Sequence, residues 1–240
     1  MTVPDGAVAS FASAIAAAGD LPATVAFAHC SGALGLSALS PLGKQHAVGS
    51  FHPLQSFPKP RAPEAFDGSV VAIDGATSAL RGRLERLARD LGARPRRVLE
   101  ADRVVYHAAA VFASNYLVAL AGEAVEMLRS IGWSEREATE GLVPLMVGAL
   151  AEVARRGPDA ALTGPIRRGD FETVNRHLEA LAAVDTQARR GRPRKAELYR
   201  MLGRIALEIA KSEGLDPAAA GRVNRALTRD VAATRGRRRR

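Results

Sequence analysis

The pattern of the chain changes near residue 100, and this change constrains the fold more than any other feature of the sequence. Residues 1–99 alternate short apolar runs with helical patterns, which indicates βαβ units and an α/β layer. Over residues 100–230 the strand signals stop and long helical periods follow, as in a helical bundle. We therefore expect an α/β domain over 1–99, a helical domain over 100–230 and a disordered arginine-rich tail over 231–240.

The first half contains four runs that are rich in strand formers, at 24–28, 47–51, 69–73 and 97–99. Helices are predicted over residues 5–18 and from a cap at Asp74 or Thr77 to Gly92. The second of these helices carries a leucine stripe, formed by Leu80, Leu84, Leu87 and Leu91. The loop over 53–63 holds four prolines, so it cannot be the interior of a helix and is expected at the surface.

The second half predicts five helices, over residues 102–131, 134–156, 170–183, 194–213 and 216–230. Ser134 and Glu137 have the spacing of a capping box, and Asp216 precedes a proline suited to the first helical position. Pro144 predicts a kink in the second helix.

The net charge of +9 is concentrated at the carboxyl end. Residues 189–240 hold 16 basic and 5 acidic side chains, and residues 1–188 have a net charge of −2. A body with that charge does not attract a polyanion, so nucleic acid is not an expected partner, except for weak contact with the tail. The alternative is that the arginine tail only raises solubility.

Several classes of protein are excluded by composition. A single cysteine, Cys30, excludes an internal disulfide framework and a cysteine metal cluster, and no metal site is predicted. No run of about 18 apolar residues and no basic leader before residues 12–18 is seen, so we expect neither a membrane span nor a signal peptide. The expected location is the cytoplasm.

Polar clusters follow two of the predicted strands. His29, Ser31 and Gly32 follow the first, and His52, Gln55 and Ser56 follow the second. Ligands of open α/β sheets bind at the carboxyl ends of strands, so these side chains are expected on one rim. A third cluster, Tyr106 and His107 with Ser114, Asn115 and Tyr116, lies in an alanine-rich helical run. Each cluster has a structural alternative, in which the polar groups only bond to neighbouring elements.

Five segments together resemble one known family. They are Val3-Pro4-Asp5, His29 to Gly32, Phe51 to Phe57, Tyr106 to Asn115 and Leu162 to Asp170, in order over about residues 2–210. The family is one of bacterial Rossmann-like oxidoreductases whose C-terminal half is a domain of unknown function. It is similar in turn to 6-phosphogluconate dehydrogenase, ketopantoate reductase and pyrroline-5-carboxylate reductase. The implied fold is α/β followed by all-α, an incomplete Rossmann-type layer with a helical bundle of the 6-phosphogluconate dehydrogenase C-terminal type.

The resemblance implies hydride transfer between NAD or NADP and a small-molecule substrate. The residues it places at the cofactor are Val3, Pro4, Asp5, His29, Ser31 and Gly32. Those it places at the substrate are His52, Gln55, Ser56, Ser114 and Arg168. Related dehydrogenases often use a helix lysine and asparagine for catalysis. No lysine lies between Lys59 and Lys195, so His107 is assigned the role of proton donor by position, with Asn115 holding the substrate oxygen.

No G-x-G-x-x-G segment occurs in the sequence. Members of the family open with a strand and a glycine-rich phosphate loop, so the resemblance implies that this chain lacks the first half of the dinucleotide-binding domain. Weak binding of NAD(P) is therefore expected, and the alternative function is a non-catalytic small-molecule-binding or dimerisation module. The helical half is expected to form a homodimer. Arg168 and Asp170 can also be read as parts of a turn and a helix cap only.

Overall fold

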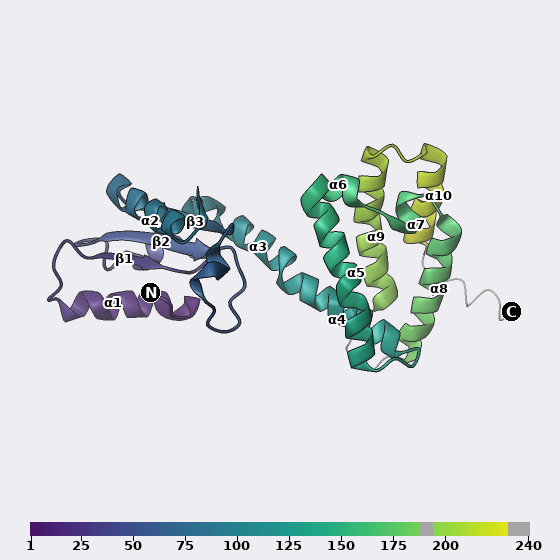
Figure 1. The fold of residues 1–240 in the computed structure, drawn as a ribbon, viewed down its shortest axis with the longest axis horizontal. Helices are drawn as coiled ribbons and strands as arrows, with labels where there is room; N and C mark the ends of the chain where they lie inside the picture. The colour runs from purple at the N-terminus through teal and green to yellow at the C-terminus, as the bar shows by residue number, and fades with distance from the viewer. Residues whose placement is uncertain (188–193, 230–240) are drawn as a thin grey trace. The chain divides into compact units, whose positions relative to one another are not determined.

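The computed structural model describes residues 1–187 and 194–229. The chain divides into two compact units, Met1–Val118 and Ala119–Arg240 (Figure 1). The division falls inside a helix rather than at residue 99, where the change of sequence pattern had placed it. The predicted tail over 231–240 lies outside the described residues.

The N-terminal unit contains a sheet of four short strands with helices around it. The strands are β1 (Ala26–His29), β2 (Ala47–Pro53), β3 (Val70–Gly75) and β4 (Arg94–Arg97). The helices are α1 (Asp5–Ala18), α2 (Ser78–Asp90) and α3 (Arg103–Ala113), with 3-10 turns η1 (Leu36–Leu39), η2 (Pro63–Phe66) and η3 (Glu100–Asp102). Three strands lie where the sequence predicts them, but the fourth ends at Arg97 instead of beginning there.

The sheet is mixed, not wholly parallel. Its order is β1-β2-β3-β4, with β1 parallel to β2, β2 antiparallel to β3 and β3 parallel to β4. Parallel neighbours need a crossover, usually through a helix, and the proline-rich segment between β2 and β3 contains only the short turn η2. The expectation of βαβ units throughout was therefore wrong at this junction, and the prolines are the physical reason.

Helices cover both faces of the sheet (Figure 1). On one face, Leu80, Leu84 and Ala88 of α2 pack against the strand residues Phe51, Val71 and Ile73. On the other face, Val8 and Ala12 of α1 form a second core with Leu39, Leu42 and Val48. Gly49 of β2 permits the close approach of α2, because a Cβ there would lie 2.9 Å from Leu84 and 3.0 Å from the Asp74 carbonyl. These two cores hold the sheet and its carboxyl-end loops in place.

The predicted long helix over 102–131 is broken once. The structure has α3 and then α4 (Asn115–Arg129), with Ser114 between them. The Ser114 hydroxyl donates to the carbonyl of Ala110 at 2.7 Å, a bond back along the helix of the kind that bends helices. Among the described residues, Glu100–Arg129 is the one stretch long and apolar enough to cross a membrane, and none of its apolar window is buried. A single such helix is weak evidence for a membrane span.

The described part of the helical unit contains the rest of α4 and six further helices. They are α5 (Glu135–Arg156), α6 (Pro158–Ala161), α7 (Gly164–Arg167), α8 (Phe171–Gln187), α9 (Lys195–Ser212) and α10 (Pro217–Thr228). The predicted capping box at Ser134 and Glu137 is present in full, and Asp216 caps α10. The segment predicted as a turn around Thr163 forms the short helix α7 instead.

The core of the helical unit lies between α7, α8, α9 and α10. Its fully or nearly buried members are Ile166, Val174, Leu178, Leu207, Ala220, Val223, Ala226 and Leu227. A second attachment is ionic: the ammonium of the buried Lys195 lies 2.9 Å from the carboxylate of Glu123. Asp185 accepts hydrogen bonds from the backbone N–H groups of Lys195 and Ala196. This carboxylate fixes the start of α9, because it satisfies two of the free N–H groups there.

Candidate active site at the strand ends

Three ring side chains meet at the carboxyl ends of the parallel strands β1 and β2. His52 closes β2, and Tyr106 and His107 follow one another on α3. The Nδ1 atom of His52 lies 2.8 Å from the Tyr106 hydroxyl, and the His52 and His107 ring centroids are 6.4 Å apart. We call these three residues the histidine–tyrosine cluster.

Gly32 forms the floor of this cluster. A Cβ at position 32 would lie 2.8 Å from Cδ2 of His107 and 2.8 Å from Nε2 of His52. Only a residue without a side chain lets both imidazoles approach the loop after β1. The sequence placed Gly32 at the cofactor, and the structure places it against two histidines.

A buried cation lies next to the cluster. The side chain of Arg103 is completely buried and donates to the Ser31 carbonyl at 3.2 Å and to the Ser50 hydroxyl. Its Nε has no hydrogen-bond partner among the described residues. Arg97, not Arg103, pairs with the nearby Asp74 carboxylate. A guanidinium that is buried without a carboxylate partner leaves a positive potential around the cluster.

The electrostatic surroundings keep His52 neutral. Burial lowers the pKa of His52 to about 4, with further lowering by His107 and by Arg103. Burial also raises the pKa of Tyr106, so its phenol stays protonated at neutral pH. At pH 7 His52 is therefore a neutral imidazole and Tyr106 a protonated phenol. The hydrogen bond between them uses Nδ1 of His52, so Nε2 is left for a ligand.

His29 is completely buried, so it does not lie on an open rim. Its Nε2 lies 3.1 Å from the Gly35 carbonyl, and its Nδ1 has no partner among the described residues. Burial lowers the pKa of this imidazole, although the bond to Gly35 acts in the opposite direction. A neutral His29 that donates from Nε2 fits this contact and ties the loop after β1 to its own strand.

Ser31 and Asp5 join the loop after β1 to the start of α1. The Ser31 hydroxyl donates to the Asp5 carboxylate at 2.8 Å and accepts from the backbone N–H groups of Ala33 and Leu34. Pro4 is the N-cap residue of α1, and Val3 is partly buried against the core under that helix. The structure therefore gathers Val3, Pro4, Asp5, Ser31 and Gly32 at one end of the unit.

Other residues that the sequence assigned to substrate lie outside this cluster. Gln55 and Ser56 make their hydrogen bonds within the proline-rich loop, Gln55 to the Ala65 carbonyl and the Ser56 N–H to Gln55. Ser114 donates to the side chain of Asn115 at 3.0 Å, and both are exposed. Arg168 is exposed in the helical unit, at the end of α7.

Tyr106 and Arg103 are the site residues that the analysis of the sequence did not assign. Tyr106 stands beside His107 in one of the segments of the resemblance, so that adjacency is a signal that was available. No feature of the sequence indicated a role for Arg103, because an arginine at the start of a helix is ordinarily solvent-exposed.

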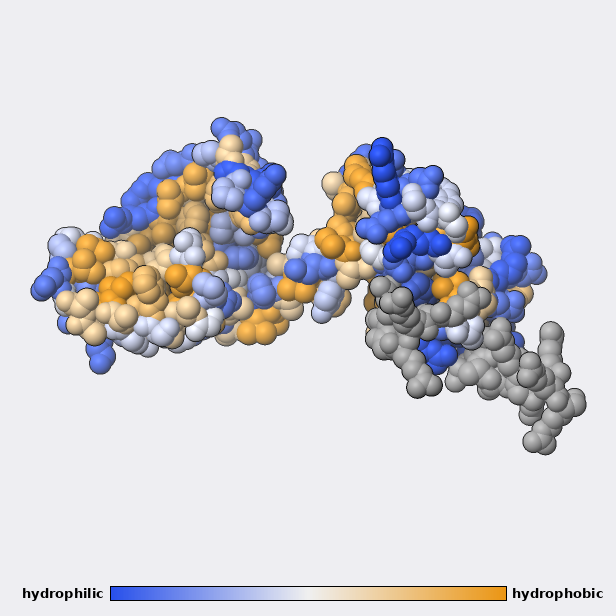
Figure 2. Space-filling model, turned by 90° about the horizontal axis from the view of Figure 1, so that it is seen from below, coloured by the Kyte–Doolittle hydropathy of each residue, from blue (hydrophilic) through white to orange (hydrophobic). Residues whose placement is uncertain are grey.

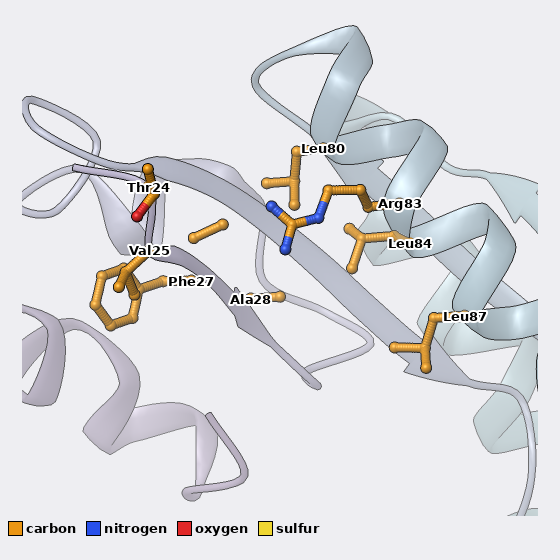
Figure 3. A pocket seen from close by; sticks show the side chains of 9 residues that line it. Thr24, Val25, Phe27, Ala28, Leu80, Arg83, Leu84 and Leu87 are labelled. Carbon is orange, nitrogen blue, oxygen red and sulfur yellow. The ribbon is translucent and has the colours of Figure 1, made fainter. Parts of the chain in front are cut away.

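A separate groove runs along β1. It has a volume of about 580 Å³ and is lined by Thr24 to Ala28 of the β1 strand region and by Leu80, Arg83, Leu84 and Leu87 of α2 (Figure 3). Arg83 is the one ionic side chain in its lining, and no histidine contributes to it. The groove is an apolar surface with no acid–base groups, so we place the candidate site at the histidine–tyrosine cluster.

Two of the residues assigned to the cofactor stand at the start of α1. The helix begins with the carboxylate of Asp5, and its N-cap Pro4 has no N–H group. An acidic group at that position repels a phosphate. Within the described ranges, no group of three or more metal-ligating side chains occurs either.

Comparison with known proteins gives one family match. The family model "Domain of unknown function (DUF2520)" matches residues 69–206. No curated protein matches the chain.

Solved structures share the fold. Protein TM1727 from Thermotoga maritima is 25% identical with a TM-score of 0.71, over 88% of this chain and 77% of that one. The "putative NADP oxidoreductase BF3122" from Bacteroides fragilis is 24% identical with a TM-score of 0.69, over 86% and 73%. A 1-pyrroline-5-carboxylate reductase from Streptococcus pyogenes is 14% identical with a TM-score of 0.50, over 95% and 74%. The predicted fold class, a Rossmann-like α/β layer followed by helices, is confirmed. The likeness of the helical half to 6-phosphogluconate dehydrogenase stays a prediction.

Proposed function

The chain belongs to the family of the domain of unknown function DUF2520, and on this premise we propose that it is an NAD(P)-dependent oxidoreductase acting on a small molecule. One observation carries the proposal: His52, Tyr106 and His107 gather at the carboxyl ends of β1 and β2. Ligands of open α/β sheets bind at such ends. The fold shared with a structure named as an NADP oxidoreductase supports the same class.

In this proposal His107 is the proton donor. It is partly exposed, unlike His29, so a substrate can reach it. His52 and Tyr106 position the His107 ring, and His52 itself adds no charge beside it, since His52 stays neutral. Reduction of a carbonyl or imine needs one proton at the heteroatom, which an imidazolium can supply near neutral pH. Asn115 is the proposed ligand of the substrate oxygen through its amide N–H group, because its amide oxygen already accepts from the Ser114 hydroxyl.

Weak binding of NAD(P) by this chain is part of the proposal. The sequence contains no G-x-G-x-x-G segment, and Asp5 occupies the start of α1. Titration of NADPH fluorescence should give no saturation in the micromolar range. A micromolar dissociation constant would show that the chain has a phosphate site outside the residues considered, and would strengthen the assignment as an oxidoreductase.

The function is tested by ligand contact at the cluster. We expect small oxo acids or cyclic imines, added as a panel, to shift the ring NMR signals of His107 and His52, and His107→Ala to abolish the shift at His52. His46→Gln is the matched control, because His46 is buried against Val25 at the other end of the sheet. If no member of the panel moves either ring, the alternative of a non-catalytic module is favoured.

A homodimer through the helical unit is the second part of the proposal. Ala138 is the one buried residue in the whole of α5, and α4 has none. Leu145 of α5 is 69% exposed and Ile205 of α9 is 60% exposed. Apolar surface of this kind shows in orange on the space-filling view (Figure 2). Long apolar helices left in water are unstable, and a second copy of the chain would cover them.

Sedimentation velocity tests the assembly. The chain should sediment as a dimer at micromolar concentration, and Leu145→Asp should shift it to monomer. Arg136→Asp, an exposed change on the same helix, should leave the dimer intact. A monomeric parent chain would remove this part of the proposal while leaving the proposed activity open.

A further inference from the structure

A second ligand-sized concavity lies in the helical unit, far along the sequence from the histidine–tyrosine cluster. It is a groove of about 260 Å³ between α8 and α10. Its lining residues are Phe171 and Asn175 of α8, Arg222, Arg225 and Ala226 of α10, and Arg229 after the end of α10. Neither the family match nor the resemblance assigns a role to this groove.

Three arginines stand on one side of the groove. Arg222, Arg225 and Arg229 are spaced by three and four residues, which places them on the same face of the chain at α10. All three are exposed, and within the described ranges none forms an ion pair with a carboxylate. None of the acidic side chains of α8, which are Glu172, Glu179 and Asp185, lines the groove. The concavity therefore carries an uncompensated positive charge.

An aromatic ring and an amide line the groove together with these charges. The guanidinium of Arg222 lies over the Phe171 ring, 5.8 Å from its centroid. Asn175 follows Phe171 by one helical turn and adds an amide donor and acceptor. Arginine planes and aromatic rings are the surfaces on which unpaired bases stack, and arginine forks match phosphate oxygens.

The packing of α10 fixes the direction of the arginine face. Val223 and Leu227 on its other side are completely buried in the core of the unit, and Asp216 caps its first turn. The helix cannot rotate its arginines away without exposing that core. The seven steps from Arg222 to Arg229 span about 10 Å at the helical rise, a length that is enough to contact more than one phosphate of a strand.

We propose that the groove between α8 and α10 is a binding site for single-stranded nucleic acid, with phosphates on the arginines and a base stacked at Phe171. The sequence around it favours a polyanion over a small phosphate compound, because residues 189–240 hold 16 basic and 5 acidic side chains. Residues 1–188 have a net charge of −2, so the basic excess of the chain lies on the α10 side of the groove.

The test is fluorescence anisotropy of the 240-residue chain with a fluorescein-labelled single-stranded 15-mer of deoxythymidine. Replacing Arg222 and Arg225 together by alanine should weaken binding at least tenfold and lower the slope of log affinity against log salt by about 1.4. Arg83→Ala with Arg86→Ala is the matched control: it removes the same charge from exposed positions on α2 and should change affinity less than twofold.

Further variants separate the groove from the tail and from charge alone. Phe171→Leu should weaken binding of the 15-mer severalfold and leave binding of an abasic strand of the same length unchanged. Replacing the arginines at 235 and 237–240 by glutamine should weaken binding less than the change in the groove does.

Three results would overturn the proposal. One is loss of binding in the tail variant with full binding in the groove variant. Another is equal loss in the control pair on α2, and the third is equal affinity for duplex, for the abasic strand and for polyglutamate. Thermal melting of each variant must match the parent chain, and Arg222→Lys with Arg225→Lys, which keeps the charge, should retain most of the affinity if lost phosphate contacts are the cause of the weaker binding.

Discussion

The two units of the molecule differ in the polar groups that they bury. The N-terminal unit buries His29, Ser50 and Arg103 completely. Both units expose large apolar side chains, at Val105 (74%) in the first and at Ile131 (70%) and Leu145 (69%) in the second, but the described part of the helical unit buries no comparable group of polar side chains. Burying polar groups lowers the stability of the fold, a cost that a structural role alone rarely justifies. Exposing apolar side chains to water is also unfavourable, and a partner that covers them removes that cost. The first unit therefore suggests chemistry and the second suggests association.

The largest effect is expected at the ion pair of Lys195 with Glu123. Among the described residues of the helical unit, Lys195 is the buried charged side chain. Lys195→Met should lower the free energy of unfolding by about 3 kcal/mol, because Glu123 is left without its cation. Urea denaturation measures it. The double variant with Glu123→Leu should recover most of the loss, and Lys211→Met, at an exposed pair, should cost under about 1 kcal/mol. A small effect at Lys195 would mean that this pair is solvated.

Two glycines, one in each unit, sharpen the comparison. Gly32→Ala should destabilise the N-terminal unit by about 2 kcal/mol, since its Cβ would lie 2.8 Å from both imidazoles. Gly148→Ala in α5 meets no atom within 4 Å and should stabilise the helical unit by about 1 kcal/mol. Thermal unfolding of both variants is the measurement. If Gly32→Ala also raised the melting temperature, the cluster around Gly32 would be loosely packed.

Acid should weaken the N-terminal unit more than the helical unit. The folded pKa of His52 is about 4, below its ordinary value of 6.5, so the unfolded chain takes up the proton first. The stabilisation is complete above pH 6.5 and is lost as the pH falls toward 4. We expect a loss of about 1.5 kcal/mol after allowance for partial exposure. His52→Gln should remove that part of the pH dependence, as followed by unfolding at pH 7 and pH 4.5.

The smallest effects test whether the units unfold separately. Thr77→Ala removes the cap of α2, and Ser134→Ala removes the capping box of α5, each for about 1 kcal/mol. Calorimetry should show each change in a different transition. A shift of the same transition by both variants would mean that the two units unfold as one.

Local signals in the sequence were enough for most elements of the fold. The caps at Thr77, Ser134 and Asp216 start their helices as predicted, because capping depends on neighbours three residues away. The prolines between β2 and β3 also held the information that no crossover helix forms there, although only the structure showed the antiparallel pairing that results. The break at Ser114 was not predicted, since a serine in an apolar helix has several possible bonds.

The sequence by itself determined the change from an α/β to a helical pattern, most of the helix starts and the candidate histidines His52 and His107, because periodicity, caps and residue type are local properties. Only the tertiary structure decided which polar groups meet. In the folded chain His52 contacts Tyr106, which is 54 positions away, and His29 is completely buried. Arg103 is buried too, and no carboxylate among the described residues forms an ion pair with it. The groove between α8 and α10 was decided in the same way, since its arginines and its aromatic ring come from helices far apart in the chain. Such contacts depend on how elements pack, and packing is not encoded in the spacing of residues along one element.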